Sequence, residues 1–340
     1  MIQQPKSQFN ALDALDMDIK PVNFLVEPWI AKADCCMVYA STGSGKSIFA
    51  LGLAIALATE NDFLGMPSKA QKVHYFDGEM GIDKITRRIK KQAGNCTNLL
   101  GLKENLKISS IDENILIGTK VSETDRLPSI AIKAGQKMYL EMIGDAEFVI
   151  FDNLDCLSYS IGKDLTEFQR WEIIRPFLSY LKTNGKTVLL VHHANRQGLQ
   201  KGDTKKEQFM DMIFKINNSK LFKDQKKKYF EVFIEKARDL LPHQTEPKLV
   251  HVDSIDGKIK LNPSCFNEAL VQRVGELMRL EMAEYKISNY LGMDSGTVAA
   301  AVIQVKDRGL DDAESFTLKM QEARKKELVL PTDFDDEDLF

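Results

Sequence analysis

Apolar and polar positions alternate in a regular way from about residue 33 onward. Short apolar runs of strand length are separated by longer segments in which apolar residues recur at helical spacing. The runs that predict buried strands are 35–39, 72–76, 105–109, 147–151 and 187–192. The segments that predict helices are 46–59, 82–93, 126–144 and 165–184. Strands that alternate with helices indicate an α/β fold with a mostly parallel central sheet.

Three further apolar runs, 229–235, 247–252 and 257–261, follow one another without helices between them. The dipeptide Asp256-Gly257 between the last two is typical of a tight hairpin turn. We therefore expect these strands to form an antiparallel addition to the sheet.

The pattern divides the chain into four parts. Residues 1–32 predict an N-terminal arm, with a short amphipathic helix and an extended link through two prolines; such an arm can cover its own core or lie on a neighbouring copy. Residues 33–262 contain the alternating strands and helices, 263–312 predict a small helical module, and 313–340 a helical and acidic tail.

The module contains the spacing of a helix-turn-helix over residues 287–302, after a helix at 266–282. Its expected core positions are Ile287, Leu291, Val298 and Val302, with the turn at Gly292 and the cap of the second helix at Asp294 or Ser295. The outward positions of the second helix are mostly small residues, which read bases poorly. We expect a winged-helix-like module that docks on protein, or on phosphates through Lys306 and Arg308.

Composition narrows the class of protein. The chain has 340 residues, enough for one large domain and a smaller unit, and its net charge is −3, so any nucleic-acid site must be a local patch. Five scattered cysteines lack metal-ligand spacing and fit reduced thiols. No apolar stretch is long enough to span a bilayer, which predicts a soluble, cytoplasmic protein without a membrane partner.

The strand at 35–39 leads directly into a glycine-rich loop, and a helix follows the loop. The loop reads Ala40-Ser41-Thr42-Gly43-Ser44-Gly45-Lys46-Ser47, with alanine where a P-loop usually has its first glycine. Backbone N–H groups of residues 41–47 can surround phosphate oxygens, Lys46 can reach the β- and γ-phosphates, and the Ser47 hydroxyl can bind Mg²⁺. The sequence therefore predicts ATP and Mg²⁺ as cofactors.

Two carboxylates end strands that should lie beside this loop. Glu79 belongs to Asp77-Gly78-Glu79-Met80 after strand 72–76, and Asp152 closes the run Phe148–Phe151. Because ligands lie beyond the carboxyl ends of parallel strands, both face the bound phosphates. We expect Glu79 to orient and deprotonate the attacking water and Asp152 to bind Mg²⁺ or its water.

His192 and His193 end the strand 187–192, where a polar side chain can sense the γ-phosphate; we expect His193 to be the sensor. The segment from Asn195 to Lys228 follows, with ten Lys and Arg against four acids. A basic loop after a sensor suits a contact with the phosphates of single-stranded DNA. The candidate contacts are Arg196, Lys201, Lys205 and Lys206.

Two more basic residues, Lys236 and Arg238, end strand 229–235. They predict either surface ion pairs with Glu235 or Asp239, or an arginine finger that reaches ATP bound to a neighbouring subunit. The C-terminal residues 331–340 contain five acids and end in Leu339-Phe340. This tail is either a solvated end or a motif that resembles the acidic tips of single-strand-binding proteins, which recruit replication partners.

Taken together, the motifs resemble those of one family. In chain order they are the P-loop, Asp-Gly-Glu-Met, Val-Ile-Phe-Asp-Asn, Val-His-His, the stretch 198–207 and Glu-Lys-Ala-Arg. Over roughly residues 20–262 the chain resembles RecA-like ATPases of plasmids, phages and mobile elements, grouped with RepA-type hexameric replicative helicases. The resemblance implies a RecA-like P-loop domain in a ring, with ATP at subunit interfaces and single-stranded DNA through the centre.

The same resemblance implies a role for each motif residue. Lys46 and Ser47 would bind phosphate and Mg²⁺, Glu79 would be the catalytic base, and Asp152 the Walker B acid. His193 would be the sensor, Arg238 with Lys236 the finger that acts on the next subunit, and the loop from Arg196 to Lys206 the DNA contact.

Our leading hypothesis is a DNA-stimulated ATPase that works as a homohexameric DNA helicase in replication of a mobile element. Two alternatives stay open: a recombination ATPase that forms filaments, and an ATP-gated regulatory module whose helix-turn-helix recruits a partner.

Overall fold

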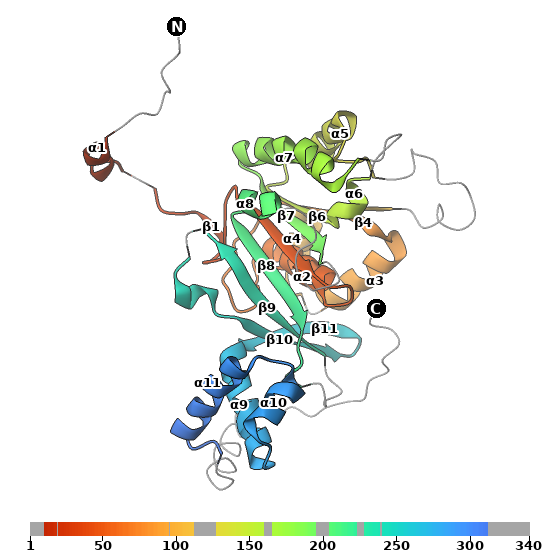
Figure 1. Cartoon of the computed structure of the whole chain (residues 1–340). Coiled ribbons are helices and arrows are strands. Elements are labelled where there is room, and N and C mark those ends of the chain that lie inside the picture. The colour runs from red at the N-terminus through yellow and green to blue at the C-terminus, as the bar shows by residue number, and fades with distance from the viewer. Residues whose placement is uncertain are drawn as a thin grey trace.

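A computed structural model of the chain describes residues 10–18, 20–94, 96–111, 127–159, 165–194, 204–222, 228–238 and 240–311 (Figure 1). The strands are β1 (Phe24–Val26), β2 (Ile30–Ala31), β3 (Cys35–Ala40), β4 (Val73–Gly81), β5 (Leu106–Ile111), β6 (Phe148–Asp152), β7 (Thr187–His193), β8 (Met212–Asn218), β9 (Lys228–Ala237), β10 (Lys248–Ile255) and β11 (Lys258–Cys265).

The helices of the large domain are α1 (Ala11–Leu15), α2 (Lys46–Thr59), α3 (Ile82–Ala93), α4 (Leu99–Asn105), α5 (Lys133–Ile143), α6 (Leu154–Leu157), α7 (Glu167–Thr183) and α8 (Thr204–Phe209). Those of the small module are α9 (Phe266–Arg279), α10 (Glu284–Leu291) and α11 (Ser295–Asp307).

In the described part of the chain, nine strands form one sheet in the order β11-β10-β9-β8-β3-β7-β6-β4-β5. The strands from β8 to β5 run parallel, whereas β9, β10 and β11 each pair antiparallel with their neighbour. The predicted α/β fold with a mostly parallel central sheet is confirmed, as is its antiparallel addition. β10 and β11 turn at Asp256-Gly257, where both residues have positive φ, as a tight hairpin requires.

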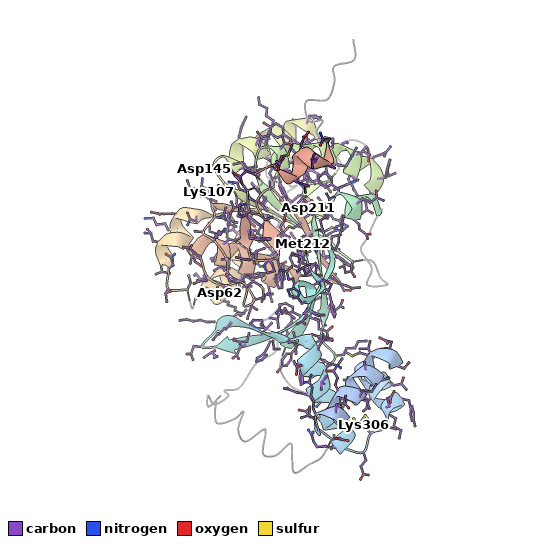
Figure 2. The ribbon with its side chains drawn as sticks, turned by 90° about the vertical axis from the view of Figure 1, so that its left-hand side faces the viewer. Asp62, Lys107, Asp145, Asp211, Met212 and Lys306 are labelled. Atoms are coloured by element: carbon purple, nitrogen blue, oxygen red, sulfur yellow. The ribbon has the colours of Figure 1, made fainter. Side chains whose placement is uncertain are left out.

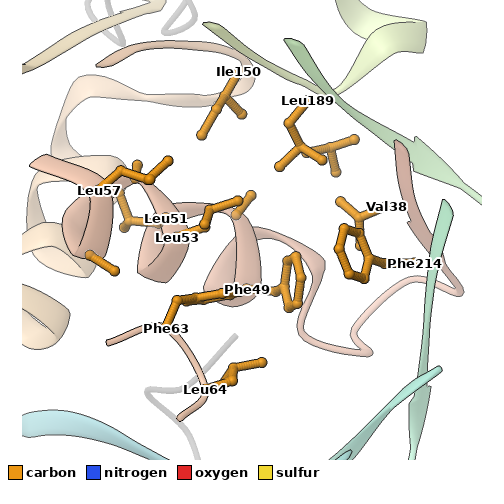
Figure 3. Close-up of a cluster of buried hydrophobic side chains, with 14 of the residues drawn as sticks. Val38, Phe49, Leu51, Leu53, Leu57, Phe63, Leu64, Ile150, Leu189 and Phe214 are labelled. Atoms are coloured by element: carbon orange, nitrogen blue, oxygen red, sulfur yellow. The ribbon is translucent and has the colours of Figure 1, made fainter. Parts of the chain in front are cut away.

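Helices cover both faces of the sheet, which explains why its central strands are apolar without interruption. Along β3, Cys36 and Val38 face the side covered by α2, whereas Met37 and Tyr39 face the side of α5, α6 and α7. Helix α2 has little polar surface because it is buried on nearly every side. Figure 3 shows its Phe49 packed beside Val38 and Phe214, which join the helix to β3 and β8.

Helices α4 and α6 were not predicted from the sequence, and three further segments differ from the prediction. Residues 24–31, expected in an extended link, form β1 and β2 and bury Leu25 and Trp29 in the core of the large domain. Helix α5 begins at Lys133 instead of 126, because the residues before it are held in another conformation: Ser129 and Ile130 donate to the carbonyls of Tyr159 and Leu157, and Ile130 is buried in the core. The basic segment 195–228, expected as one loop, contains α8 and β8, and β8 pairs with β3 inside the sheet.

The small module contains the predicted helix-turn-helix. The core positions Ile287, Leu291, Val298 and Val302 are all buried. Gly292 forms the turn at φ 62°, and the Asp294 side chain caps α11 by accepting the backbone N–H of Thr297 at 2.8 Å. Figure 2 shows Lys306 of α11 in this module, away from Asp211 and Met212 of the large domain. Across the described residues, no helix is long and apolar enough to cross a membrane.

Candidate active site

The loop between β3 and α2 has the backbone geometry of a phosphate-binding loop. Gly43 and Gly45 have φ angles of 78° and 96°, and a Cβ at Gly45 would lie 3.4 Å from the ring of Phe230. The ammonium of Lys46 is buried at the start of α2 and donates to the carbonyl oxygens of Ala40 and Ser41, at 3.0 and 2.9 Å. Burial lowers the pKa of Lys46, and the nearby carboxylates of Asp152 and Glu79 oppose that shift.

Asp152 ends β6 beside the loop, as predicted, and its carboxylate is almost fully buried. It accepts hydrogen bonds from the hydroxyls of Tyr75 and Ser47, while burial raises its pKa. Because the Ser47 hydroxyl and the Asp152 carboxylate meet, they present two hard oxygen ligands of the kind that Mg²⁺ prefers. When bound there, Mg²⁺ would neutralise charge on the β- and γ-phosphate oxygens.

A tight turn at the end of β4 presents Glu79. The buried carboxylate of Asp77 accepts the backbone N–H groups of Glu79 and Met80, at 3.0 and 2.9 Å. Burial raises the pKa of Asp77 to about 7. Asp77 therefore fixes the turn from inside, while the side chain of Glu79 stays half exposed on the phosphate side.

Glu79, Asn153 and His193 lie together at the ends of β4, β6 and β7. Nδ2 of Asn153 lies 2.5 Å from Oε2 of Glu79 and 2.9 Å from Nε2 of His193, so one amide bridges both groups. Oε2 of Glu79 is 3.7 Å from Nε2 of His193. The adjacent His193 side chain lowers the pKa of Glu79, and Asn153 and Lys46 lower it further. An ionised Glu79 beside Lys46 can accept a proton from water, and His193 can respond to the charge next to it.

Asn153 is a site residue that was not predicted from the sequence, where it appears only within the motif Val-Ile-Phe-Asp-Asn. Asn153 also caps α6, since its Oδ1 accepts the N–H of Cys156 at 2.9 Å. Asn153 directly follows Asp152 at the end of a predicted strand, and this position could have identified it, because the carboxyl ends of parallel strands lie at the same edge of the sheet.

His192 faces the opposite side of β7 from His193 and belongs to a separate cluster. Its ring nitrogens lie 3.9 Å from Asp155 and 3.8 Å from Glu167. The ammonium of Lys206 lies 2.5 Å from Glu167 and 3.4 Å from His192.

This geometry corrects one of the predicted DNA contacts. Lys206 is only 3% exposed, so its charge is used inside the protein and does not reach a DNA backbone. Arg196 and Lys201 lie outside the described residues, and so does the side chain of Lys205.

Lys236 and Arg238 lie at the edge of the sheet opposite the P-loop. Their strand, β9, is antiparallel to β8, and its last residue, Ala237, pairs with Met212 of β8. Met212 in turn pairs with Cys36, near the start of β3, whereas the P-loop follows the other end of β3. Lys236 donates to the carbonyl of Glu207 at 2.5 Å, and Arg238 lies 3.4 Å from the carboxylate of Asp211. Of the two expected ion-pair partners, Glu235 pairs instead with Lys215 at 3.0 Å, and Asp239 lies outside the described residues.

A sequence model of one protein family, described as the AAA domain, matches residues 3–198. Among solved structures, the chain is similar to the flagellar accessory protein FlaH from Methanocaldococcus jannaschii, at 11% identity and a TM-score of 0.46, over 68% of this chain and 90% of that one. It is also similar to a KaiC-like protein from Pyrococcus horikoshii OT3, at 13% identity and a TM-score of 0.49, over 70% of this chain and 94% of that one. No curated protein matches the sequence.

Proposed function

The chain belongs to the AAA domain family and has a RecA-like P-loop ATPase fold, and from this premise we propose that it is a DNA-stimulated motor that works as a ring. The observation that carries the proposal is the cluster of Glu79, Asn153 and His193 beside the P-loop lysine. This set contains a carboxylate that can activate water, a lysine that can hold phosphate, and side chains that can couple them to a second site.

Each residue of the cluster has a task in hydrolysis. Lys46 and the loop N–H groups hold the phosphates, and they stabilise the charge that develops on the γ-phosphoryl group. Glu79, ionised and half exposed, orients the attacking water and takes its proton. Asn153 positions Glu79, and through the same amide it links the carboxylate to His193 at the start of the basic segment.

The position of Arg238 supports a site that is shared between subunits. Cys36 and Ala40 of β3 are about 13 Å apart at the strand rise per residue, and Arg238 lies beyond the Cys36 end. The guanidinium therefore cannot serve the P-loop of its own chain. Its half-exposed side chain is available to a neighbouring copy in a ring, for which we propose a hexamer with Arg238 and Lys236 acting on the next ATP.

The proposed partner is single-stranded DNA, held by Arg196, Lys201 and Lys205 of the basic segment. These residues follow β7, so a change at His193 reaches them through a short length of chain. The acidic residues 331–340 are proposed to recruit a replication protein, and the work of the ring would be helicase activity in replication of a mobile element.

A complementation experiment tests the shared site. Arg238→Ala lacks the finger and Glu79→Gln lacks the base, so each alone should hydrolyse ATP poorly. In rings that contain both variants, a Glu79→Gln subunit supplies its Arg238 to the ATP site of a neighbouring Arg238→Ala subunit, which still has Glu79. That shared site is then complete. The proposal predicts activity in the mixture well above the sum of the two variants, and stimulation of the wild type by single-stranded DNA.

The control is Arg87→Ala, which removes an exposed arginine of α3 and should leave hydrolysis unchanged. If Arg238→Ala hydrolyses ATP normally, the mixture shows only the sum, and DNA changes nothing, the shared-ring motor is wrong. Electron microscopy with ATP and DNA then separates rings from filaments or single protomers.

A further inference from the structure

A cleft of about 530 Å³ lies between the P-loop and the small module. It is lined by Ser41 and Ser44 of the loop, Asn217 and Lys220 at the end of β8, and Met293 and Thr297 of the module. Figure 1 shows α10 near the end of β8, and residues of both elements line the cleft. The small module therefore forms one wall of a space that begins at the phosphate-binding loop.

The positions of the catalytic side chains fix the direction in which a nucleotide must lie. Glu79 and Asp152 end β4 and β6, on one side of β3, so the γ-phosphate points toward that side. The rest of the nucleotide must leave the P-loop in the other direction, toward the ends of β8 and β9. The cleft lies on that side, because Asn217 of β8 and Glu231 of β9 are register partners there.

The lining of the cleft suits a nucleoside. Its volume is in the range of about 300–1,000 Å³ that small-molecule sites occupy. The rings of Phe233 and Phe266, with centroids 5.5 Å apart, supply an apolar surface for a base. The amide of Asn217 supplies a donor and an acceptor, and the hydroxyl of Thr297, which donates to Asp294 at 2.6 Å, supplies an acceptor from the opposite wall.

We infer that the nucleoside half of the bound nucleotide occupies this cleft and contacts the turn between α10 and α11. The inference rests on the proposed function, since it takes the P-loop as the site of the triphosphate. It assigns the small module a role in ATP recognition, and it makes the module responsive to the nucleotide.

The packing around the turn explains how that response would spread. A Cβ on Gly292 would lie 2.8 Å from Nζ of Lys220, so the turn and the end of β8 are already in close contact. Behind the turn, Leu291 packs in a cluster that also contains Leu221 and Leu249 of the large domain. A nucleotide that presses on the turn therefore acts on a continuous core and not on a loose linker.

The first test compares ATP with inorganic tripolyphosphate, which has the phosphates but no nucleoside. Calorimetry in Mg²⁺ would measure the affinity of the full chain for each compound, in the wild type and in Met293→Ala. We expect this substitution to weaken ATP binding between about threefold and tenfold and to leave tripolyphosphate unchanged. The matched control is Met282→Ala, which shortens a methionine of the same module core away from the cleft and should preserve the preference for ATP.

The second test uses the unaltered chain. Hydrogen exchange of the amides in 291–297 should slow with ATP and not with tripolyphosphate. If both compounds bind but neither Met293→Ala nor exchange distinguishes them, the inference is wrong and the proposed function stands. If Met293→Ala and Met282→Ala misfold and bind neither ATP nor tripolyphosphate, hydrogen exchange in the wild type alone tests the inference. If the wild type binds neither compound, the proposed function itself fails.

Discussion

Glu231 gives a test of the structure that does not depend on any ligand. This carboxyl group is 6% exposed in β9, between β8 and β10. Burial raises its pKa from 4.5 to about 7, although it accepts hydrogen bonds from the Ser219 side chain and the Lys220 N–H and lies near the Lys220 charge. The proton is therefore held more tightly in the folded chain than in the unfolded chain.

The sign of the effect on stability follows from the two pKa values. Below pH 4.5 the group is protonated in both states, so it adds no pH dependence. As the pH rises from 4.5 to 7, the unfolded chain loses the proton first, and the free energy of unfolding falls. For a shift from 4.5 to about 7, linkage gives a loss of roughly 2.5 kcal/mol between pH 5 and pH 8.

The perturbation is Glu231→Gln, which keeps the size of the side chain and an oxygen that accepts the same hydrogen bonds. Urea unfolding at pH 5 and pH 8 would give the free energy of unfolding for both proteins, without nucleotide. The variant should gain about 2.5 kcal/mol relative to the wild type between these pH values.

A matched control is Glu268→Gln. The hydrogen bond from Arg308 lowers the pKa of Glu268, so its titration falls below this pH range. The difference between the Glu268→Gln variant and the wild type should therefore stay constant. The reasoning about the burial of Glu231 would be refuted if the difference in free energy of unfolding between Glu231→Gln and the wild type also stayed constant. It would be refuted as well if the wild type became more stable than the variant at pH 8.

Three further predictions concern the nucleotide site. In Gly78→Ala, the new Cβ would lie 2.6 Å from the buried side chain of Leu157. Calorimetric unfolding should therefore show a free energy of unfolding lower by about 1–3 kcal/mol, and kcat for ATP hydrolysis should fall because Glu79 is displaced. Asn153→Ala removes the amide bridge, so kcat should fall roughly tenfold to a hundredfold in a phosphate-release assay while ATP affinity changes little; equal kcat would contradict the positioning role. Lys46→Ala removes the ammonium that faces the phosphates, so titration calorimetry should show ATP affinity at least tenfold weaker, and unchanged affinity would place the phosphates elsewhere.

The sequence predicted the parts of the site that depend on strand ends. Carboxyl ends of parallel strands share one edge, so the carboxylates of Glu79 and Asp152 could be placed beside the P-loop from the sequence alone. The bridge through Asn153 could not, because a 2.5 Å contact depends on the turn that Asp77 holds in place.

The basic segment shows why the remaining features were harder to predict. Lys215 lies within β8 and pairs with Glu235, and Lys206 is buried against Glu167. Glu235 and Glu167 are distant in sequence from these lysines, so the high density of Lys and Arg in the segment suggested a solvated loop. The apolar residues at 212–214 were the signal for a strand, and the surrounding lysines obscured it.

The central claim is that Glu79 activates water for attack on ATP at this P-loop. Steady-state phosphate release by wild type and Glu79→Gln, with ATP affinity measured in parallel, tests it most directly. The account predicts that kcat falls about 10²–10⁴-fold while affinity for ATP is retained. A Glu79→Gln variant that releases phosphate at the wild-type rate would contradict the account.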